Sequence, residues 1–272
     1  MESLHYKERT VEWLTIVLIV TMVYSSPAPS LAQKYSLGIK AGPNISLARF
    51  RDEDLRNEFG SKPKPGFQVG GLIMFPMKEK YTFVAEAGYA QRGRRLTFNS
   101  DEWENSNTYQ FIDLSMALRK SFRINFKENV IANWYFNVGP NVQHLLTGTG
   151  KIKTGGDPFK YKIRINQQPD ADFNFNYYND INRWMFGIDF GIGADAVIQR
   201  NQVIYAELRF TMGQTHLGKH TSESFMNILG FEDDLRSNIK TLSLTAAYIF
   251  DFDKKQNRMG KSTKDKKKRR RR

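Results

Sequence analysis

The stretch WMFGIDFGIGADAVIQRNQVIYAELRFTMGQTHL, residues 184–217, decides the fold. Even-numbered positions from 184 to 198 carry Trp, Phe, Ile and Ala, and the same parity resumes from residue 204. The odd-numbered positions carry the charged side chains Asp189, Asp195, Glu207 and Arg209. A period of two predicts two strands, each with one apolar and one polar face. Both strands are long compared with the ~5–6 residues that are usual in soluble proteins.

The hairpin between these two strands is predicted from the same parity. If even-numbered residues share one face on both strands, cross-strand partners sum to an even number, so Ile198 pairs with Gln202. This leaves a three-residue loop, 199–201. The loop ends in Asn201, and asparagine is one of the few non-glycine residues that tolerate a left-handed backbone.

The same alternation occurs in most of the chain. It predicts further strands over residues 35–47, 67–75, 82–98, 109–122, 130–146 and 239–252. Short connections near residues 78–80, 125–129 and 199–201 alternate with longer ones, and the longest is a predicted loop over 147–182. The pattern predicts an all-β, eight-stranded, antiparallel, up-and-down transmembrane β-barrel with short periplasmic turns and long extracellular loops.

Composition agrees with a barrel and excludes several other classes of protein. The mean hydropathy of −0.54 excludes a helical membrane bundle, whereas alternating strands average to a polar composition. The chain has no Cys among its 272 residues, which excludes disulfides, zinc–thiolate sites and cysteine nucleophiles.

Both ends of the chain differ from the central domain, which we place at 33–252. Residues 1–32 contain an eleven-residue apolar run, 14–24, and small residues before Gln33, and so predict a secretory signal peptide. The tail, 253–272, holds twelve Lys/Arg and two Asp, a net charge of +10 out of a formal +13. We expect a disordered basic periplasmic tail, and export argues against a nucleic-acid partner.

The polar face of the strands predicts a charge network inside the barrel. Its expected members are Lys40, Glu86, Asp113, Arg119, Asp189, Asp195, Glu207 and Arg209. We interpret them as structural, because charged groups sealed inside a narrow barrel must pair with one another. Glu86 and Asp113 are expected to pair with Arg92, Arg94 or Arg119.

Aromatic residues are placed near the predicted strand ends, as in the aromatic girdles of membrane barrels. Trp134 and Trp184 are expected at opposite ends of the barrel. Three further aromatic residues, at positions 248, 250 and 252, close the last strand.

An ordered series of segments resembles the PorT-like outer-membrane β-barrel family of Gram-negative bacteria. The segments are KYSLGIKAGPNISL, GFQVGGLIMFPM, FVAEAGYAQRG, YQFIDLSMALRKSF, WYFNVGPNVQHLL, DFGIGADAVI, ELRFTMGQTHL and LSLTAAYIF, which together cover about residues 34–252. The resemblance implies a barrel in the cell outer membrane, and it brings no catalytic motif. The founding member of the family is linked to type IX protein secretion and gliding.

We therefore expect a non-enzymatic envelope role that is structural, adhesive or accessory to secretion, with both termini in the periplasm. No cofactor or metal is expected, and the expected partners are outer-membrane lipid and other envelope proteins, with the chain as a monomer. A type IX secretion or gliding component is one alternative. Another is a soluble periplasmic lipocalin-like barrel that binds an apolar ligand, which would turn Ile188, Phe190, Leu208 and Phe210 inward.

A third possibility is a barrel enzyme at the extracellular rim. It would require His144 and His216 to converge with an acidic residue. His220, Asp233 and Asp234 are predicted at the same end. The sequence contains neither a GxSxG nor an HExxH spacing, which favours incidental loop residues.

Overall fold

A computed structural model describes residues 34–50, 53, 60–78, 80–98, 103–127, 130–154, 157–167, 175–178, 181–199, 202–218 and 235–253. This part of the chain is all-β, as the alternation predicts, and it contains no helix long and apolar enough to cross a membrane. Residues Tyr35–Phe252 form one compact unit. The predicted signal peptide and the basic tail after Asp253 lie outside the described residues, as do His220, Asp233 and Asp234.

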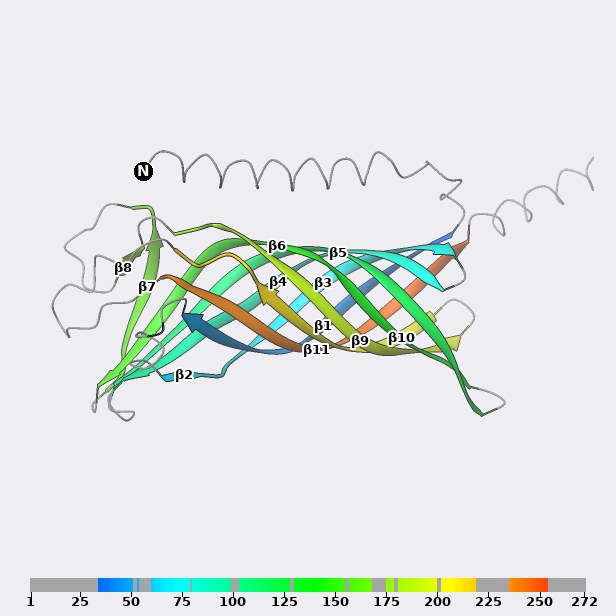
Figure 1. Ribbon diagram of the computed structural model, residues 1–272, viewed down its shortest axis with the longest axis horizontal. Coiled ribbons are helices and arrows are strands. Elements are labelled where there is room, and N and C mark those ends of the chain that lie inside the picture. Colours follow the sequence, from blue (N-terminus) through cyan, green and yellow to red (C-terminus); the bar gives the residue numbers. More distant parts are fainter. Residues whose placement is uncertain are drawn as a thin grey trace, which may run out of the picture. The chain divides into compact units, whose positions relative to one another are not determined.

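Eight long strands form a closed ring (Figure 1). They are β1 (Lys34–Phe50), β3 (Lys64–Lys78), β4 (Tyr81–Phe98), β5 (Trp103–Lys127), β6 (Val130–Thr154), β9 (Trp184–Gln199), β10 (Gln202–Gly213) and β11 (Ser237–Asp253). Strand β5 joins β4 to β6, and β1 lies between β3 and β11, so each strand of the ring has two neighbours. The pairs from β1·β3 round to β10·β11 are antiparallel. Closure removes the unpaired edges that an open sheet would expose.

Three short strands extend one end of the ring, at the left of Figure 1. They are β2 (Gly60–Lys62), β7 (Phe159–Ile165) and β8 (Phe175–Tyr178). Strand β7 pairs antiparallel with β6, and β8 pairs parallel with β7. The prediction of a loop over 147–182 is therefore wrong, because β6 continues to Thr154 and recruits β7. The predicted connection over residues 99–108 is also too long, because β5 already begins at Trp103.

The β9–β10 hairpin follows the predicted parity along the strands but not at the turn. Val203 pairs with Val197 and Ile204 with Ala196, as the even sum requires. Gln202, however, pairs with Gln199 rather than with Ile198, and the register shifts between Gln202 and Val203. The predicted three-residue loop is wrong because a β-bulge absorbs one residue before the turn.

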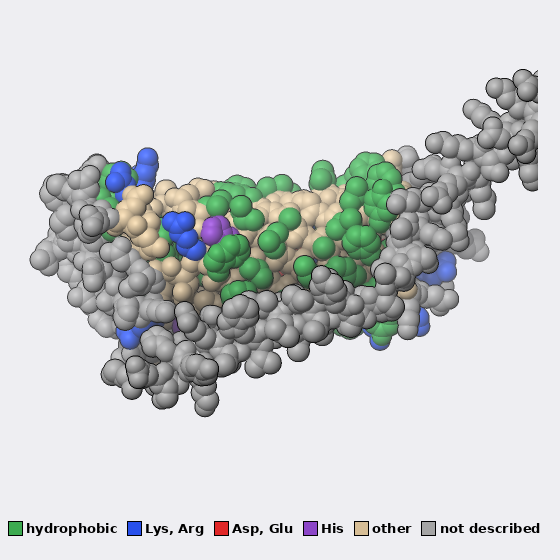
Figure 2. Space-filling view, turned by 90° about the horizontal axis from the view of Figure 1, so that it is seen from above, with side chains coloured by type: hydrophobic (Ala, Val, Ile, Leu, Met, Phe, Trp, Pro, Cys, Tyr) green, Lys and Arg blue, Asp and Glu red, His purple; other side chains and the backbone are tan. Residues whose placement is uncertain are grey.

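The two faces of the ring differ in chemistry. The outward face carries exposed apolar side chains, and Figure 2 shows them in green over the middle of the wall. On β10, Leu208 is 44% and Phe210 37% exposed, whereas Glu207 is 1% and Arg209 5% exposed. This arrangement contradicts the lipocalin-like alternative, which needs the apolar residues inside.

Aromatic residues border the apolar middle of the wall on both sides. At one end, Trp134 stacks on Phe122 with ring centroids 4.5 Å apart, and Tyr35 stacks on Phe252 at 5.3 Å. At the other end, Trp184 lies opposite His144 in the β6–β9 pair. The tryptophans therefore lie at opposite ends of the barrel.

The end that carries β7 and β8 has an apolar interior. Its buried cluster contains Tyr109, Phe111, Leu145, Ile152, Tyr161, Ile163, Ile165, Tyr178, Ile181, Met185, Leu217, Leu235 and Ile239. We call this cluster the apolar cap. We call the wall around it, formed by β7, β8 and the ends of β5 and β6 beyond Phe111 and Leu146, the outer extension. A backbone hydrogen bond from Leu217 N to Ser237 O, at 2.8 Å, joins two further segments that contribute to the apolar cap.

Candidate functional site

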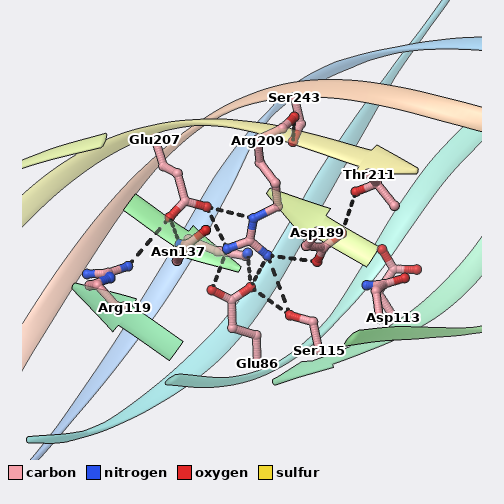
Figure 3. A network of polar contacts seen from close by, with 12 residues as sticks. Glu86, Asp113, Ser115, Arg119, Asn137, Asp189, Glu207, Arg209, Thr211 and Ser243 are labelled. Atoms are coloured by element: carbon pink, nitrogen blue, oxygen red, sulfur yellow. Dashed lines mark hydrogen bonds and ion pairs between the residues drawn. The ribbon is translucent and has the colours of Figure 1, made fainter. Parts of the chain in front are cut away.

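Arg209 is the centre of the polar network in the barrel interior (Figure 3). Its parity on β10 turns the guanidinium inward, where it meets carboxylates from other strands. Nη1 and Nη2 donate to the two Glu86 carboxylate oxygens at 2.6 and 2.8 Å, a bidentate pair. Nε donates to Glu207 Oε1 at 2.7 Å, and Nη1 lies 3.4 Å from Asp189 Oδ2. One guanidinium thus joins three carboxylates from β4, β9 and β10.

Glu86 extends the network toward β1 and β5. Lys40 from β1 forms an ion pair with Glu86 Oε2, and Ser115 from β5 donates to the same oxygen at 3.3 Å. Asp189 accepts a further hydrogen bond from Thr211 Oγ1 at 2.7 Å. The contacts link strands on opposite sides of the ring, so they cross the lumen rather than follow one wall.

Glu207 continues the network toward the end at which β1 begins and β11 ends. Its Oε2 accepts hydrogen bonds from Asn137 Nδ2 at 2.7 Å and from the Tyr135 hydroxyl at 3.1 Å. Arg119 Nη2 lies 3.5 Å from the same oxygen. The Arg119 guanidinium also stacks on Tyr135, 3.7 Å from the ring centroid, and reaches Tyr205 at 4.9 Å. Sequence parity could have placed both tyrosines inside, but they were not among the predicted members.

The other two predicted members lie apart from this cluster. Asp113 forms an ion pair with Arg92, which is one of the three partners expected for it. Asp195 accepts a hydrogen bond from Asn133 Nδ2 at 2.8 Å and is only half-buried. Glu86 pairs with Lys40 and Arg209, so the prediction that Arg92, Arg94 or Arg119 would be its partner is wrong.

The network is balanced in charge and nearly closed to solvent. Lys40, Arg119 and Arg209 oppose Glu86, Asp189 and Glu207, and all six are buried. Desolvating each ion costs several kcal/mol, so such a cluster is tolerated only when each charge has close partners. Removing one member leaves the others buried and uncompensated.

Side chains fill the lumen at this level. The cavity beside the network, lined by Lys40, Glu86, Asp113, Asp189 and Arg209 among others, has a volume of about 30 Å³. A single buried water needs roughly 10–15 Å³ on this measure, so the space holds one or two waters. An eight-stranded ring is just wide enough for its side chains to fill it.

Two glycines of β9 make room for bulky interior groups on β6. A Cβ at Gly193 would lie 2.5 Å from the Tyr135 ring, and one at Gly191 would lie 2.1 Å from Asn137 Oδ1. Both glycines therefore allow close packing in the lumen.

The residues considered for rim chemistry do not form a cluster in the described part. The His144 ring lies on the outward face against Trp184, with centroids 4.4 Å apart. His216 follows β10, and its carbonyl accepts a hydrogen bond from Asn182. No group of three His, Asp or Glu suited to a metal ion occurs among the described residues.

Comparison with known proteins agrees with this geometry. The model of the family described as "Outer membrane protein beta-barrel domain" matches residues 30–217, more than half of the chain. A search of curated proteins found no match.

Several solved outer-membrane structures are similar to the chain. The attachment invasion locus protein Ail of Yersinia pestis is 15% identical with a TM-score of 0.34, and the match covers 80% of this chain and 99% of Ail. The outer membrane protein OprG from Pseudomonas aeruginosa is 8% identical with a TM-score of 0.46, covering 81% and 97%. Neisserial surface protein A is 11% identical with a TM-score of 0.38, covering 79% and 97%.

Proposed function

We propose that this chain, which belongs to the outer membrane protein β-barrel domain family, is a closed membrane anchor with a non-enzymatic role in the cell envelope. The observation that carries the proposal is the division of its two faces. An apolar outer wall suits lipid, and a lumen filled by ion pairs is not suited to solute diffusion.

The proposed orientation follows the lengths of the connections. Residues 79–80, 128–129 and 200–201 connect strands at one end, where β1 also begins and β11 ends. We assign these short turns and both termini to the periplasm, and the outer extension with its apolar cap to the cell exterior. The barrel is then an up-and-down transmembrane anchor that holds a packed β-structure above the membrane.

An extension held on a rigid anchor suits a structural or adhesive role. The PorT-like resemblance adds an accessory role in protein secretion as a more specific candidate. In either role the chain acts as a monomer in outer-membrane lipid, with other envelope proteins as partners, and the interior charges stabilise the barrel rather than conduct ions.

Fractionation combined with conductance tests the anchor proposal. The full chain should stay in the membrane pellet after carbonate extraction, and reconstituted protein should add no stepwise conductance to a planar bilayer. Release into the soluble fraction would contradict membrane insertion. Steady ohmic conductance by the wild type would contradict the closed lumen. A deletion strain that keeps its secreted proteome unchanged would exclude the secretion accessory role and leave the anchor intact.

A further inference from the structure

A groove on the outside of the outer extension has the properties of an anion site. It has a volume of about 620 Å³, and its lining includes Lys64, Lys151, Lys160 and Lys162 from β3, β6 and β7. Three hydroxyl side chains, Ser106, Thr108 and Thr149, line the same groove. No Asp or Glu is among the lining residues. Lysines attract phosphate as point charges, and hydroxyls can both donate to and accept from sugar hydroxyls.

The strand register places like charges opposite each other in this groove. Lys151 of β6 pairs directly with Lys160 of β7, and Lys162 lies opposite Thr149. Directly opposed like charges destabilise an antiparallel pair. These three lysines form no ion pair in the described part of the chain, and Lys151, Lys160 and Lys162 are all exposed. Glu104 lies on the same face of β5 as Ser106 and Thr108, but it already pairs with Arg95 at 2.6 Å. An external anion would relieve the repulsion.

The groove continues the lipid-facing wall beyond the apolar middle. Leu146 is the last strongly exposed apolar residue of β6 on this face, and Lys151 follows five residues later. At ~3.3 Å per residue and a tilt of ~40°, Lys151 lies about 12 Å higher along the barrel axis. The headgroup layer of a phospholipid is only ~6 Å thick, so its phosphates end below the level of the Lys151 backbone. Phosphates carried on sugars reach that height.

We propose that this groove binds the phosphorylated saccharide headgroup of a glycolipid in the outer leaflet. The inference rests on the proposed orientation, which puts the outer extension outside the cell. The lysines hold the phosphates, the Thr108 and Thr149 hydroxyls contact the sugar, and the acyl chains lie against the apolar wall beneath. The bound glycolipid would fix the depth of the barrel and pack against the extension.

Binding of bisphosphorylated lipid A to the full chain in phosphatidylcholine nanodiscs tests the proposal. Each surface lysine contributes about fivefold to the affinity for an anionic headgroup, so Lys151→Gln/Lys160→Gln should weaken binding about 25-fold. The charge-retaining pair Lys151→Arg/Lys160→Arg should restore it. The matched control is Lys80→Gln/Arg123→Gln, which removes the same charge from exposed residues at the opposite end and should leave binding unchanged.

Three further probes distinguish the possible sources of phosphate. Dephosphorylated lipid A and phosphatidylglycerol should each bind much more weakly than bisphosphorylated lipid A. The phosphorylated sugar freed of its acyl chains should also bind weakly. Equal affinity for phosphatidylglycerol would overturn the sugar-borne phosphate, and equal affinity for the acyl-free sugar would overturn the lipid as its source. An equal loss of lipid A affinity in Lys151→Gln/Lys160→Gln and in the control Lys80→Gln/Arg123→Gln would show that the groove is not the binding site.

A parallel check separates failure of this inference from failure of the anchor proposal. Carbonate extraction and the heat-dependent gel mobility of each variant report membrane insertion and folding. If the wild type is folded and inserted but does not bind lipid A, only the glycolipid site is refuted. If carbonate releases the protein from the membrane, the anchor proposal itself is refuted.

Discussion

The barrel middle and the outer extension use the same two strands in opposite ways. In the middle of β5, Ile112, Leu114, Met116 and Leu118 face outward while Ser115 and Arg119 face the lumen. In the extension the outward positions are polar or charged, and the interior is the apolar cap. The register of β5 with β6 shifts between Gln110 and Phe111, close to the change.

This inversion shows which medium each part of the wall meets. Backbone geometry alternates side chains between two faces everywhere, but it does not choose which face is apolar. Apolar side chains turn outward where the outside is lipid, and inward where the outside is water. The level of the register shift therefore separates the part of the wall suited to lipid from the part suited to water.

The largest effect is expected from breaking the interior charge network. Arg209→Met leaves Glu86, Glu207 and Asp189 buried without their shared cation, and should lower the free energy of unfolding by about 3–5 kcal/mol. Urea titration in lipid vesicles, followed by tryptophan fluorescence, measures it. The control Arg95→Met breaks a partly exposed pair between β4 and the extension, which should cost about 0–1 kcal/mol. Equal losses would mean that the middle is as hydrated as the extension.

A second test introduces the same charge into the outward wall at two levels. Leu208→Arg puts a guanidinium on the apolar middle of β10 and should cost about 2–4 kcal/mol in a bilayer. Thr149→Arg on the outer extension should cost no more than about 1 kcal/mol. The same urea titration compares the two variants. If Leu208→Arg did not lower the free energy of unfolding, the assignment of that face to lipid would be contradicted.

A smaller effect is expected from removing a buried hydrogen-bond donor within the apolar cap. The Tyr161 hydroxyl donates to Asn105 Oδ1 at 3.0 Å and also contacts Asn107 Oδ1 at 2.5 Å. Tyr161→Phe leaves these buried amides short of a donor and should cost about 1–3 kcal/mol. Limited proteolysis of the extension should report local loosening while the barrel middle stays resistant. Exposed Phe159, replaced by Leu, serves as the neighbouring control, with an expected change within about 0.5 kcal/mol.

The smallest effect should be stabilising. Lys160→Glu replaces a like-charge pair with an opposite-charge pair across from Lys151, and should raise the unfolding free energy by about 0.2–1 kcal/mol when no anionic glycolipid is present. The gain should shrink as salt rises, because exposed charges are screened. A loss of stability in low salt would show that Lys160 is not repelled by Lys151.

The sequence predicted the eight long strands and the inward parity of the charged residues because period-2 alternation is local. It missed the far end of β6 and its partner β7, because residues 147–182, which include the glycines at 148 and 150, were predicted as one loop. In the structure, a Cβ at Gly150 would lie 1.9 Å from the Tyr161 ring, so the glycine is required by packing that only the paired strands reveal. The short strand β8 has too few residues to show a period.

The ion-pair partners of the interior charged residues were harder to predict than the strand face on which these residues lie. Glu86 was expected to pair with an arginine on its own or the neighbouring strand. It pairs instead with Lys40 and Arg209, which come from β1 and β10. Which side chains meet across a lumen depends on the closure of the ring and on strand tilt, and neither can be read from one segment.

The most direct test of the central claim is a cysteine scan along β5, in a chain that has no native Cys. Single spin-labelled cysteines from position 104 to 118 in vesicles would be exposed to oxygen, which concentrates in lipid, and to a water-soluble nickel chelate. The account predicts that labels at 112, 114, 116 and 118 collide with oxygen, that those at 104, 106 and 108 collide with nickel, and that those at 113 and 115 are shielded from both. Collision with nickel at 112–118 would contradict the assignment of this wall to lipid.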